Sequence, residues 1–138
     1  MKKLTPNLMV KDVRKSVEFY TKILGFTLNM AVPENSQAIE QKLEDNKEYA
    51  YAMVSCDEVF FMLMRSDVFA EDLPMLKNIE IGASVSFYLD VDNIDEVYNS
   101  LKDKVEISKD LHNTWYGMRE FYIKDCDGYV LGFAERSR

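Results

Sequence analysis

Apolar residues in the first half of the chain follow a strand spacing and then a helical spacing. Residues 4–10 alternate loosely between apolar and polar side chains, as in a half-buried strand. Apolar residues then recur three or four positions apart, which places them on one face of a helix. These residues are Val13, Val17, Tyr20 and Leu24. Asp12 is suited to cap this helix and Gly25 to end it, so a strand followed by a helix is predicted.

Three further strands are predicted before residue 66. They span residues 26–32, 48–55 and 59–65. The second alternates between the two faces of a sheet, whereas the third is nearly all apolar and is expected to be buried on both faces. Residues 37–47 are polar and acidic. Their pattern allows either a short helix or an ordered loop.

The second half repeats this order of elements. Residues 83–91 form the predicted strand, and the next helix begins at Asn93, where Glu96 three positions later completes a capping box. The apolar stripe of this helix is Ile94, Val97, Tyr98 and Leu101. A short strand at residues 105–108 and a loop at residues 109–114 are expected to follow.

The last stretch predicts a β-hairpin. Residues 120–124 and 129–133 are rich in aromatic and β-branched side chains and flank the sequence Asp-Cys-Asp-Gly. An Asp-Gly pair between two such runs is a strong hairpin signal, because the turn needs residues that tolerate positive φ.

The two halves match in kind when the first is shifted by 81 residues, which sets Val10 on Val91 and Asp12 on Asn93. The predicted fold class is α+β, with two βαβββ modules forming a curved mixed sheet around a shared cleft. Residues 1–138 form one domain, with module 1 at about 1–65, a linker with a turn or two of helix at 66–82, and module 2 at about 83–138. Function is expected in the cleft.

Composition narrows the possible partners. A hydrophobic content of 47% indicates a globular protein, and no apolar run reaches the length needed to span a bilayer. Cys56 and Cys126 lie far apart without metal-like spacing, which fits a reducing cytoplasm. The basic N-terminus lacks the apolar stretch of a signal peptide. The net charge of −7 disfavours nucleic acid and favours a cationic small molecule.

Two motifs resemble those of the vicinal oxygen chelate superfamily. Residues 8–26 read LMVKDVRKSVEFYTKILGF, and residues 115–135 read WYGMREFYIKDCDGYVLGFAE. Both are similar to patterns shared by glyoxalase I, extradiol dioxygenases, fosfomycin-resistance enzymes and bleomycin-resistance proteins. The resemblance covers nearly the whole chain and implies the paired-module fold, but the scaffold serves several chemistries and plain binding.

The resemblance also implies positions for the ligands of a divalent metal, usually His, Gln or Glu. In this chain those positions hold Thr5, Met62, Ser86 and Gly132. Hydroxyls are weak ligands, a thioether prefers soft ions, and glycine has no side chain. No metal and no cofactor are therefore expected. The single histidine, His112, is interpreted as a loop residue rather than a general base.

The same resemblance implies a ligand cleft lined by apolar and aromatic side chains. If Thr5 and Ser86 face inward, alternation places Asn7, Met9, Tyr88 and Asp90 inward too, and Met62 places Phe60 and Met64 there. The candidate ligand-binding residues are Trp115, Tyr116, Met62, Phe60, Tyr88, Asn7, Tyr51 and Arg119. Trp115 resembles a Trp near the drug in the bleomycin-resistance group, although it could equally be a core residue. Tyr49 and Tyr51 could line the cleft or pack across strands.

Three functions remain open at this point. The first is a metal-free binding protein that sequesters a planar ligand, favoured to be cationic, in an aromatic cleft. The alternative is a metal-dependent lyase, isomerase or dioxygenase, for which the sequence lacks the ligand set. Metal-independent catalysis by Arg119, Glu120 or His112 has no positive support. The resemblance also implies a homodimer, swapped or unswapped, and no membrane partner is expected.

Overall fold

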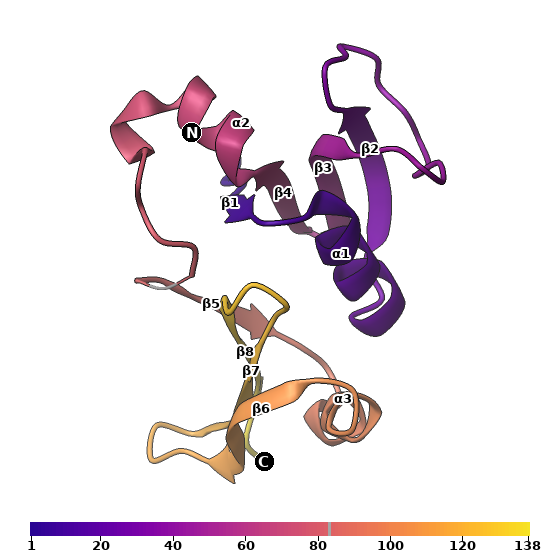
Figure 1. Cartoon of the computed structure of the whole chain (residues 1–138). Coiled ribbons are helices and arrows are strands. Elements are labelled where there is room, and N and C mark those ends of the chain that lie inside the picture. Colours follow the sequence, from indigo (N-terminus) through magenta and orange to yellow (C-terminus); the bar gives the residue numbers. More distant parts are fainter. Residues whose placement is uncertain (83) are drawn as a thin grey trace. The chain divides into compact units, whose positions relative to one another are not determined.

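The chain folds into two compact units. A computed structural model describes residues 1–82 and 84–138, and its two units are Met1–Ile81 and Gly82–Arg138 (Figure 1). Each unit contains a four-stranded mixed sheet with one helical segment between its first and second strands. The predicted α+β class with two βαβββ modules is confirmed. No helix in the described residues is long and apolar enough to cross a membrane.

The first unit contains the sheet β1-β4-β3-β2, in which the parallel pair is β1 and β4. Its elements are β1 (Asn7–Val10), α1 (Val13–Glu18), the π-helix η1 (Phe19–Ile23), β2 (Thr27–Pro33), β3 (Tyr49–Cys56) and β4 (Val59–Arg65). They are followed by α2 (Ser66–Asp72) and the 3-10 helix η2 (Pro74–Leu76). The helical turns expected after β4 correspond to α2 and η2.

Helix α1 begins and packs as its sequence predicts. The Asp12 carboxylate accepts a hydrogen bond from the Lys15 N–H at 3.2 Å, which satisfies one of the free donors of the first turn. Tyr20 is fully buried, with its ring centroid 5.5 Å from that of Phe26 and 5.6 Å from that of Phe61. The helical segment therefore covers the face of the sheet to which Phe61 belongs.

The expectation that β4 is buried on both faces is wrong. Phe61 and Leu63 are buried, whereas Phe60, Met62 and Met64 are only half-buried. Because side chains alternate along a strand, the second set lies on the face turned away from α1. The apolar run in β4 therefore does not indicate burial on both faces. One face is covered by α1, and the other carries large apolar side chains that are only partly covered.

The second unit repeats the same sheet order, as β5-β8-β7-β6 with β5 parallel to β8. Its elements are β5 (Ser86–Asp90), α3 (Ile94–Leu101), β6 (Glu106–Asn113), β7 (Met118–Lys124) and β8 (Val130–Arg136). The strand predicted at 83–91 begins at Ala83, which lies outside the described residues. The identical strand order agrees with the internal duplication inferred from the sequence.

The predicted terminal hairpin is confirmed. Strands β7 and β8 pair antiparallel from Met118↔Arg136 to Lys124↔Val130. Between them, the Asp125 carboxylate accepts hydrogen bonds from the N–H groups of Asp127 and Tyr129, both at 2.9 Å. Gly128 has a φ of 91°, a conformation that favours glycine.

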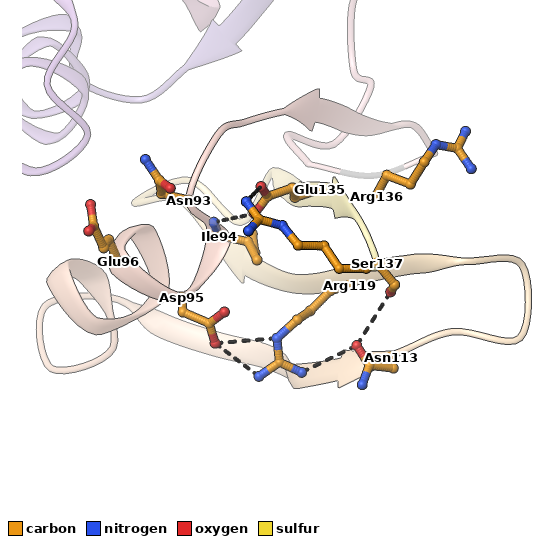
Figure 2. A pocket seen from close by; sticks show the side chains of 10 residues that line it. Asn93, Ile94, Asp95, Glu96, Asn113, Arg119, Glu135, Arg136 and Ser137 are labelled. Atoms are coloured by element: carbon orange, nitrogen blue, oxygen red, sulfur yellow. Dashed lines mark hydrogen bonds and ion pairs between the residues drawn. The ribbon is translucent and has the colours of Figure 1, made fainter.

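Two predictions for the second unit are wrong. Strand β6 extends to Asn113, so most of the expected loop at 109–114 is strand, paired with β7 through two register shifts. Asn93 has a left-handed φ of 57°, and its side chain makes no capping bond in the described chain. The Ile94 N–H is instead bonded at 2.8 Å to the carboxylate of Glu135 on β8 (Figure 2).

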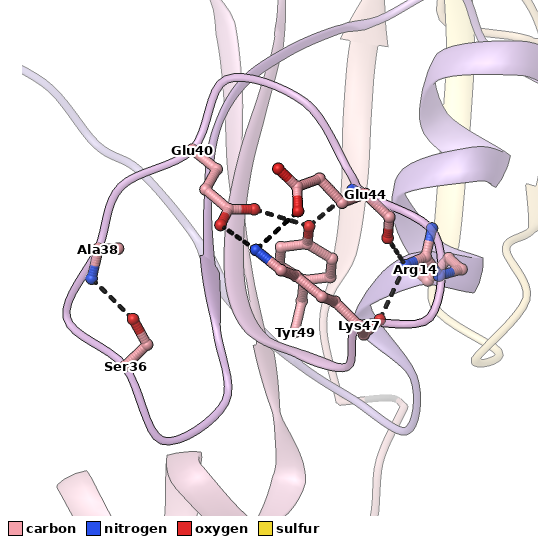
Figure 3. A network of polar contacts seen from close by, with 7 residues as sticks. All are labelled: Arg14, Ser36, Ala38, Glu40, Glu44, Lys47 and Tyr49. Carbon is pink, nitrogen blue, oxygen red and sulfur yellow. Dashed lines mark hydrogen bonds and ion pairs between the residues drawn. The ribbon is translucent and has the colours of Figure 1, made fainter.

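The segment between β2 and β3 is an ordered loop, one of the two alternatives left open by its sequence. Glu40 forms a β-bridge with Ala31, and its carboxylate accepts hydrogen bonds from Lys47 at 2.7 Å and Tyr49 at 2.8 Å (Figure 3). These hydrogen bonds lower the pKa of Glu40. Arg14 of α1 donates to the carbonyl oxygen of Lys47 at 2.8 Å. The loop is thereby fastened to both the sheet and α1.

Candidate functional site

The face of the second sheet turned away from α3 carries an aromatic cluster. Phe121 packs on Tyr98 of α3 with ring centroids 5.2 Å apart, so its neighbours Glu120 and Tyr122 point to the opposite face. There they meet Tyr88 of β5 and Tyr116 of the turn between β6 and β7. We call Tyr88, Tyr116 and Tyr122, together with Glu120, the tyrosine face.

Glu120 lies at the centre of this cluster. Its side chain is 1% exposed, and each of its two carboxylate oxygens accepts a phenol hydrogen. Tyr88 donates to Oε2 at 2.6 Å, and Tyr116 donates to Oε1 at 2.6 Å. The Nε2 atom of His112 on β6 lies 3.7 Å from Oε1. The carboxylate therefore links three segments of the second unit.

The surroundings of Glu120 favour its ionised form. Burial by itself would raise the pKa of Glu120, but the hydrogen bonds from Tyr116 and Tyr88, with the charges of His112 and Lys109, outweigh it and lower the pKa. Burial and the bond to Glu120 raise the pKa of Tyr88 well above its usual value. At neutral pH the cluster is an anion held by two neutral phenols.

Trp115 stands at the tip of the turn between β6 and β7. It is 94% exposed, and its ring meets that of Tyr116 edge-on with centroids 5.4 Å apart. Thr114 closes the turn, because its hydroxyl accepts from the Met118 N–H at 2.9 Å and donates to the Met118 carbonyl at 3.0 Å. Trp115 is therefore a surface residue on an ordered turn, not a core residue.

A second apolar surface lies on the first sheet, on the face turned away from α1. Asn7, Met62, Met53 and Met30 stand in one row across the four strands, and Met9, Met64, Tyr51 and Val32 stand in the next. We call these two rows the methionine face. Phe60 follows on β4, with the Lys3 ammonium 3.1 Å from its ring centroid. The buried Oδ1 of Asn7 has no hydrogen-bond partner in the described chain.

These observations place most of the predicted ligand-binding residues. Asn7, Tyr51 and Met62 lie together on the methionine face, with Phe60 beside them. Tyr49, by contrast, is 1% exposed and lies beneath the loop that precedes β3. The predicted residues Tyr88 and Tyr116 are brought together by Glu120, and Trp115 stands beside Tyr116.

Arg119 lies apart from the tyrosine face. It donates to the carboxylate of Asp95 on α3 at 3.0 Å and to the side chain of Asn113 at 3.4 Å (Figure 2). It lines a polar hollow of about 490 Å³ near the start of α3, which also includes Glu135 and Arg136. Arg119 points to the side of the sheet that α3 covers, because it alternates with Glu120.

The metal positions implied by the resemblance do not fit a divalent ion. A Cβ atom at Gly132 would lie 2.5 Å from the ring of Tyr122, which fills the space that a ligating side chain would need. The other positions hold Thr5, Met62 and Ser86, none of which is a good ligand for such an ion. No group of three or more His, Cys, Asp or Glu residues in the described chain could hold a metal ion.

The sequence analysis did not predict that Glu120 lies at the centre of the tyrosine face or that Tyr122 belongs to it. Both could have been found from the hairpin, because the Asp-Gly turn fixes the register that sets Tyr122 opposite Gly132. Alternation from Tyr122 then places Glu120 on the same face. The hydrogen bond from Tyr88 spans 32 residues of sequence and had no local signal.

Comparison with protein families shows the family to which the chain belongs. The family model described as the glyoxalase/bleomycin resistance protein/dioxygenase superfamily matches residues 4–133. The chain belongs to this superfamily. Within the superfamily it is similar to bleomycin resistance proteins of Geobacillus stearothermophilus and Staphylococcus aureus. Each is 26% identical over 140 residues, covering 95% of this chain and 94% of the relative.

Solved structures from other organisms share the fold. A glyoxalase/bleomycin resistance protein/dioxygenase from Nocardioides matches with a TM-score of 0.74 and 19% identity, covering 100% of this chain and 85% of the other. TnmS3, an antibiotic binding protein from Streptomyces sp. CB03234, matches with a TM-score of 0.67 and 18% identity, covering 99% and 97%. At these identities the likeness concerns the fold alone.

Proposed function

We propose that this protein binds a planar, cationic small molecule without a metal ion and that the tyrosine face and Trp115 form the surface that holds it. The observation that carries the proposal is the exposure of aromatic rings on an ordered framework. Tyr88 is 46% exposed, Tyr116 is 48% exposed and Trp115 is 94% exposed. Large aromatic side chains left open to solvent in one cluster are typical of a binding site.

The chemistry of the cluster matches a flat ligand. Aromatic side chains stack on planar molecules and bury a large area with little loss of conformational freedom. A cation over the face of such a ring is also attracted to its electron density. The net charge of −7 raises the local concentration of cations near the protein. The similarity to bleomycin resistance proteins and to an antibiotic binding protein supports a small molecule as the partner.

Fluorescence of the single tryptophan gives a direct test. Bleomycin and 9-aminoacridine, a planar cation at neutral pH, are titrated into the protein, and calorimetry gives the affinity independently. We expect quenching with saturable binding, and we expect Trp115→Ala to weaken binding by about fivefold, since one stacked ring contributes about 1 kcal/mol. Lys124→Ala, a change on the exposed end of β7, serves as the control and retains full affinity.

Two results would contradict the proposal. The first is an absence of any heat of binding across a broad panel of planar cations. The second is a stoichiometric transition metal retained through purification and required for binding. That result would support a metal-dependent lyase, isomerase or dioxygenase instead, because the ion would then polarise oxygen atoms of a substrate.

A further inference from the structure

We infer that Glu120 makes the tyrosine face select a cation over a neutral molecule of the same shape, and that it acts through Tyr88 and Tyr116 rather than by touching the ligand. The inference rests on the proposed function, because it names the residue that gives that site its charge preference. Glu120 is thus a positioning and specificity residue.

The geometry separates the carboxylate from the surface. Both of its oxygens are occupied by phenol hydrogens at 2.6 Å, and the side chain is 1% exposed. The two hydroxyls come from different segments, β5 and the turn before β7, and both turn inward toward the same carboxylate. About half of each tyrosine remains exposed. A ligand on this face therefore meets the rings, while the charge lies beneath them.

A buried charge in this position acts on the rings in two ways. A phenol that donates to an ionised carboxylate gains electron density on its ring, which strengthens the attraction of the ring for a cation. The negative charge also reaches the surface through a medium of lower dielectric than water, so it is screened less than an exposed carboxylate. A neutral ligand of the same shape gains neither effect.

The other titratable groups around Glu120 leave this preference in place. His112 Nε2 lies 3.7 Å from the carboxylate, and Lys109 of the same strand contributes a positive charge nearby. Tyr122 is neutral and adds a third ring, and burial raises its pKa. Among these groups, the carboxylate is the only negative charge that both phenols contact directly in the described chain.

The test compares two probes of one shape in wild type and variants. Calorimetry at pH 7.5 measures 9-aminoacridine, a cation, and acridine, its neutral parent. We expect Glu120→Gln to weaken binding of the cation by about tenfold, equivalent to about 1.4 kcal/mol, and to change binding of the neutral probe by less than twofold. A purely structural role would weaken both probes equally.

Two further variants isolate the mechanism. Glu96→Gln removes the same charge from α3 and is expected to leave both affinities unchanged, so that net charge is controlled. The double change of Tyr88→Phe and Tyr116→Phe keeps both rings but removes the hydroxyls, and should also abolish the preference for the cation. If Glu120→Gln does not fold, this double variant tests the inference in its place.

The outcomes separate the inference from the proposed function. If both probes bind but wild type shows no preference for the cation, or if Glu120→Gln weakens them equally, the inference is wrong and the binding function stands. If Glu96→Gln has the same effect as Glu120→Gln, overall charge explains the selectivity and the inference is again wrong. If neither probe binds to wild type, the proposed function fails and the inference fails with it.

Discussion

At Gly132 the backbone of β8 lies directly beneath the ring of Tyr122. Three atoms of that ring would stand within 3.0 Å of a Cβ atom at position 132. Such distances require the ring to move, although the backbone of Gly132 itself has no positive φ that would demand glycine. Space rather than backbone conformation therefore makes glycine necessary here.

The first prediction concerns this close contact. Gly132→Ala should lower the free energy of unfolding by about 1–3 kcal/mol, because the added methyl group overpacks the site. The same change made together with Tyr122→Leu should cost clearly less, since the ring is then absent. Urea unfolding of the two single variants and the double variant measures the coupling. Strictly additive effects would show that the ring and the methyl group do not compete for space.

The second prediction concerns the pH dependence of stability at Glu120. Its pKa in the folded protein lies below the ordinary value of 4.5, so the unfolded chain binds the proton more tightly. The stabilisation is therefore complete above pH 4.5 and is lost as the pH falls through the folded-state pKa. Glu120→Gln should cost about 1–2 kcal/mol at pH 7 and progressively less in acid. Thermal unfolding between pH 7 and pH 3 gives this difference, and a constant gap would contradict it.

Single residues differ in how far sequence could place them. The resemblance placed Thr5, Met62 and Ser86 on the cleft side, and alternation then added Asn7 and Tyr88 to that side. The structure pairs Asn7 with Met62 and leaves Tyr88 46% exposed, and their place in a shared cleft stays a prediction. Arg119 and Tyr116 were both predicted to bind the ligand, yet Arg119 bonds Asp95 on the side of the sheet covered by α3, whereas Tyr116 bonds Glu120 on the other side. Trp115 could not be assigned from sequence, because a turn residue has no periodic neighbours to indicate its burial.

At the scale of elements, α3 shows how a distant segment can replace a local signal. The spacing of Asn93 and Glu96 predicted a capping box, but the first N–H of the helix is bonded to Glu135, 41 residues later. A carboxylate at a helix N-terminus also interacts favourably with the helix dipole. The position of the helix was predictable, whereas the residue that caps it depends on the pairing of β5 with β8.

The third prediction follows from this cap. Glu135→Ala should lower the free energy of unfolding by about 1 kcal/mol, as expected for the loss of a helix cap. Glu96→Ala, at the position expected from sequence to complete a capping box with Asn93, should cause no measurable change. Urea unfolding followed by circular dichroism compares the two. A larger effect at Glu96 than at Glu135 would contradict the observed cap.

The fourth prediction concerns the loop between β2 and β3. Tyr49→Phe removes a buried hydroxyl that donates to Glu40 and accepts from the Glu44 N–H at 2.7 Å, and should cost about 1 kcal/mol. Hydrogen exchange at the Glu44 amide should accelerate. Tyr51→Phe is the matched control, because the Tyr51 hydroxyl makes no hydrogen bond in the described chain. Equal exchange rates in both variants would show that the Tyr49 hydroxyl does not hold the loop in place.

At the scale of the whole molecule, one arrangement of four strands and a helix occurs twice. The order β1-β4-β3-β2 recurs as β5-β8-β7-β6, each with one parallel and two antiparallel pairings. This repeat was visible in the sequence because each half has the same order of strand-like and helix-like spacing of apolar residues. The length of β6 was not, since its half-exposed polar residues give no clear alternation and its pairing is interrupted twice.

The fifth prediction is the oligomeric state. The methionine face carries large apolar side chains that are partly open in a single chain, and such a surface favours association. We expect a homodimer, with a mass of twice 16.1 kDa in sedimentation equilibrium. A mass of one chain at every concentration tested would contradict this expectation.

The placement of β8 between β5 and β7 has a consequence for synthesis on the ribosome. Strand β5 stands at an edge and pairs only with β8 among the described strands, and α3 waits for Glu135 on that same strand. Strand β5 and helix α3 leave the exit tunnel well before β8, which supplies the pairing partner of β5 and the carboxylate that caps α3. During translation, the nascent second unit therefore exposes β5 without its partner strand. Chaperones that recognise such segments can bind it until β8 emerges.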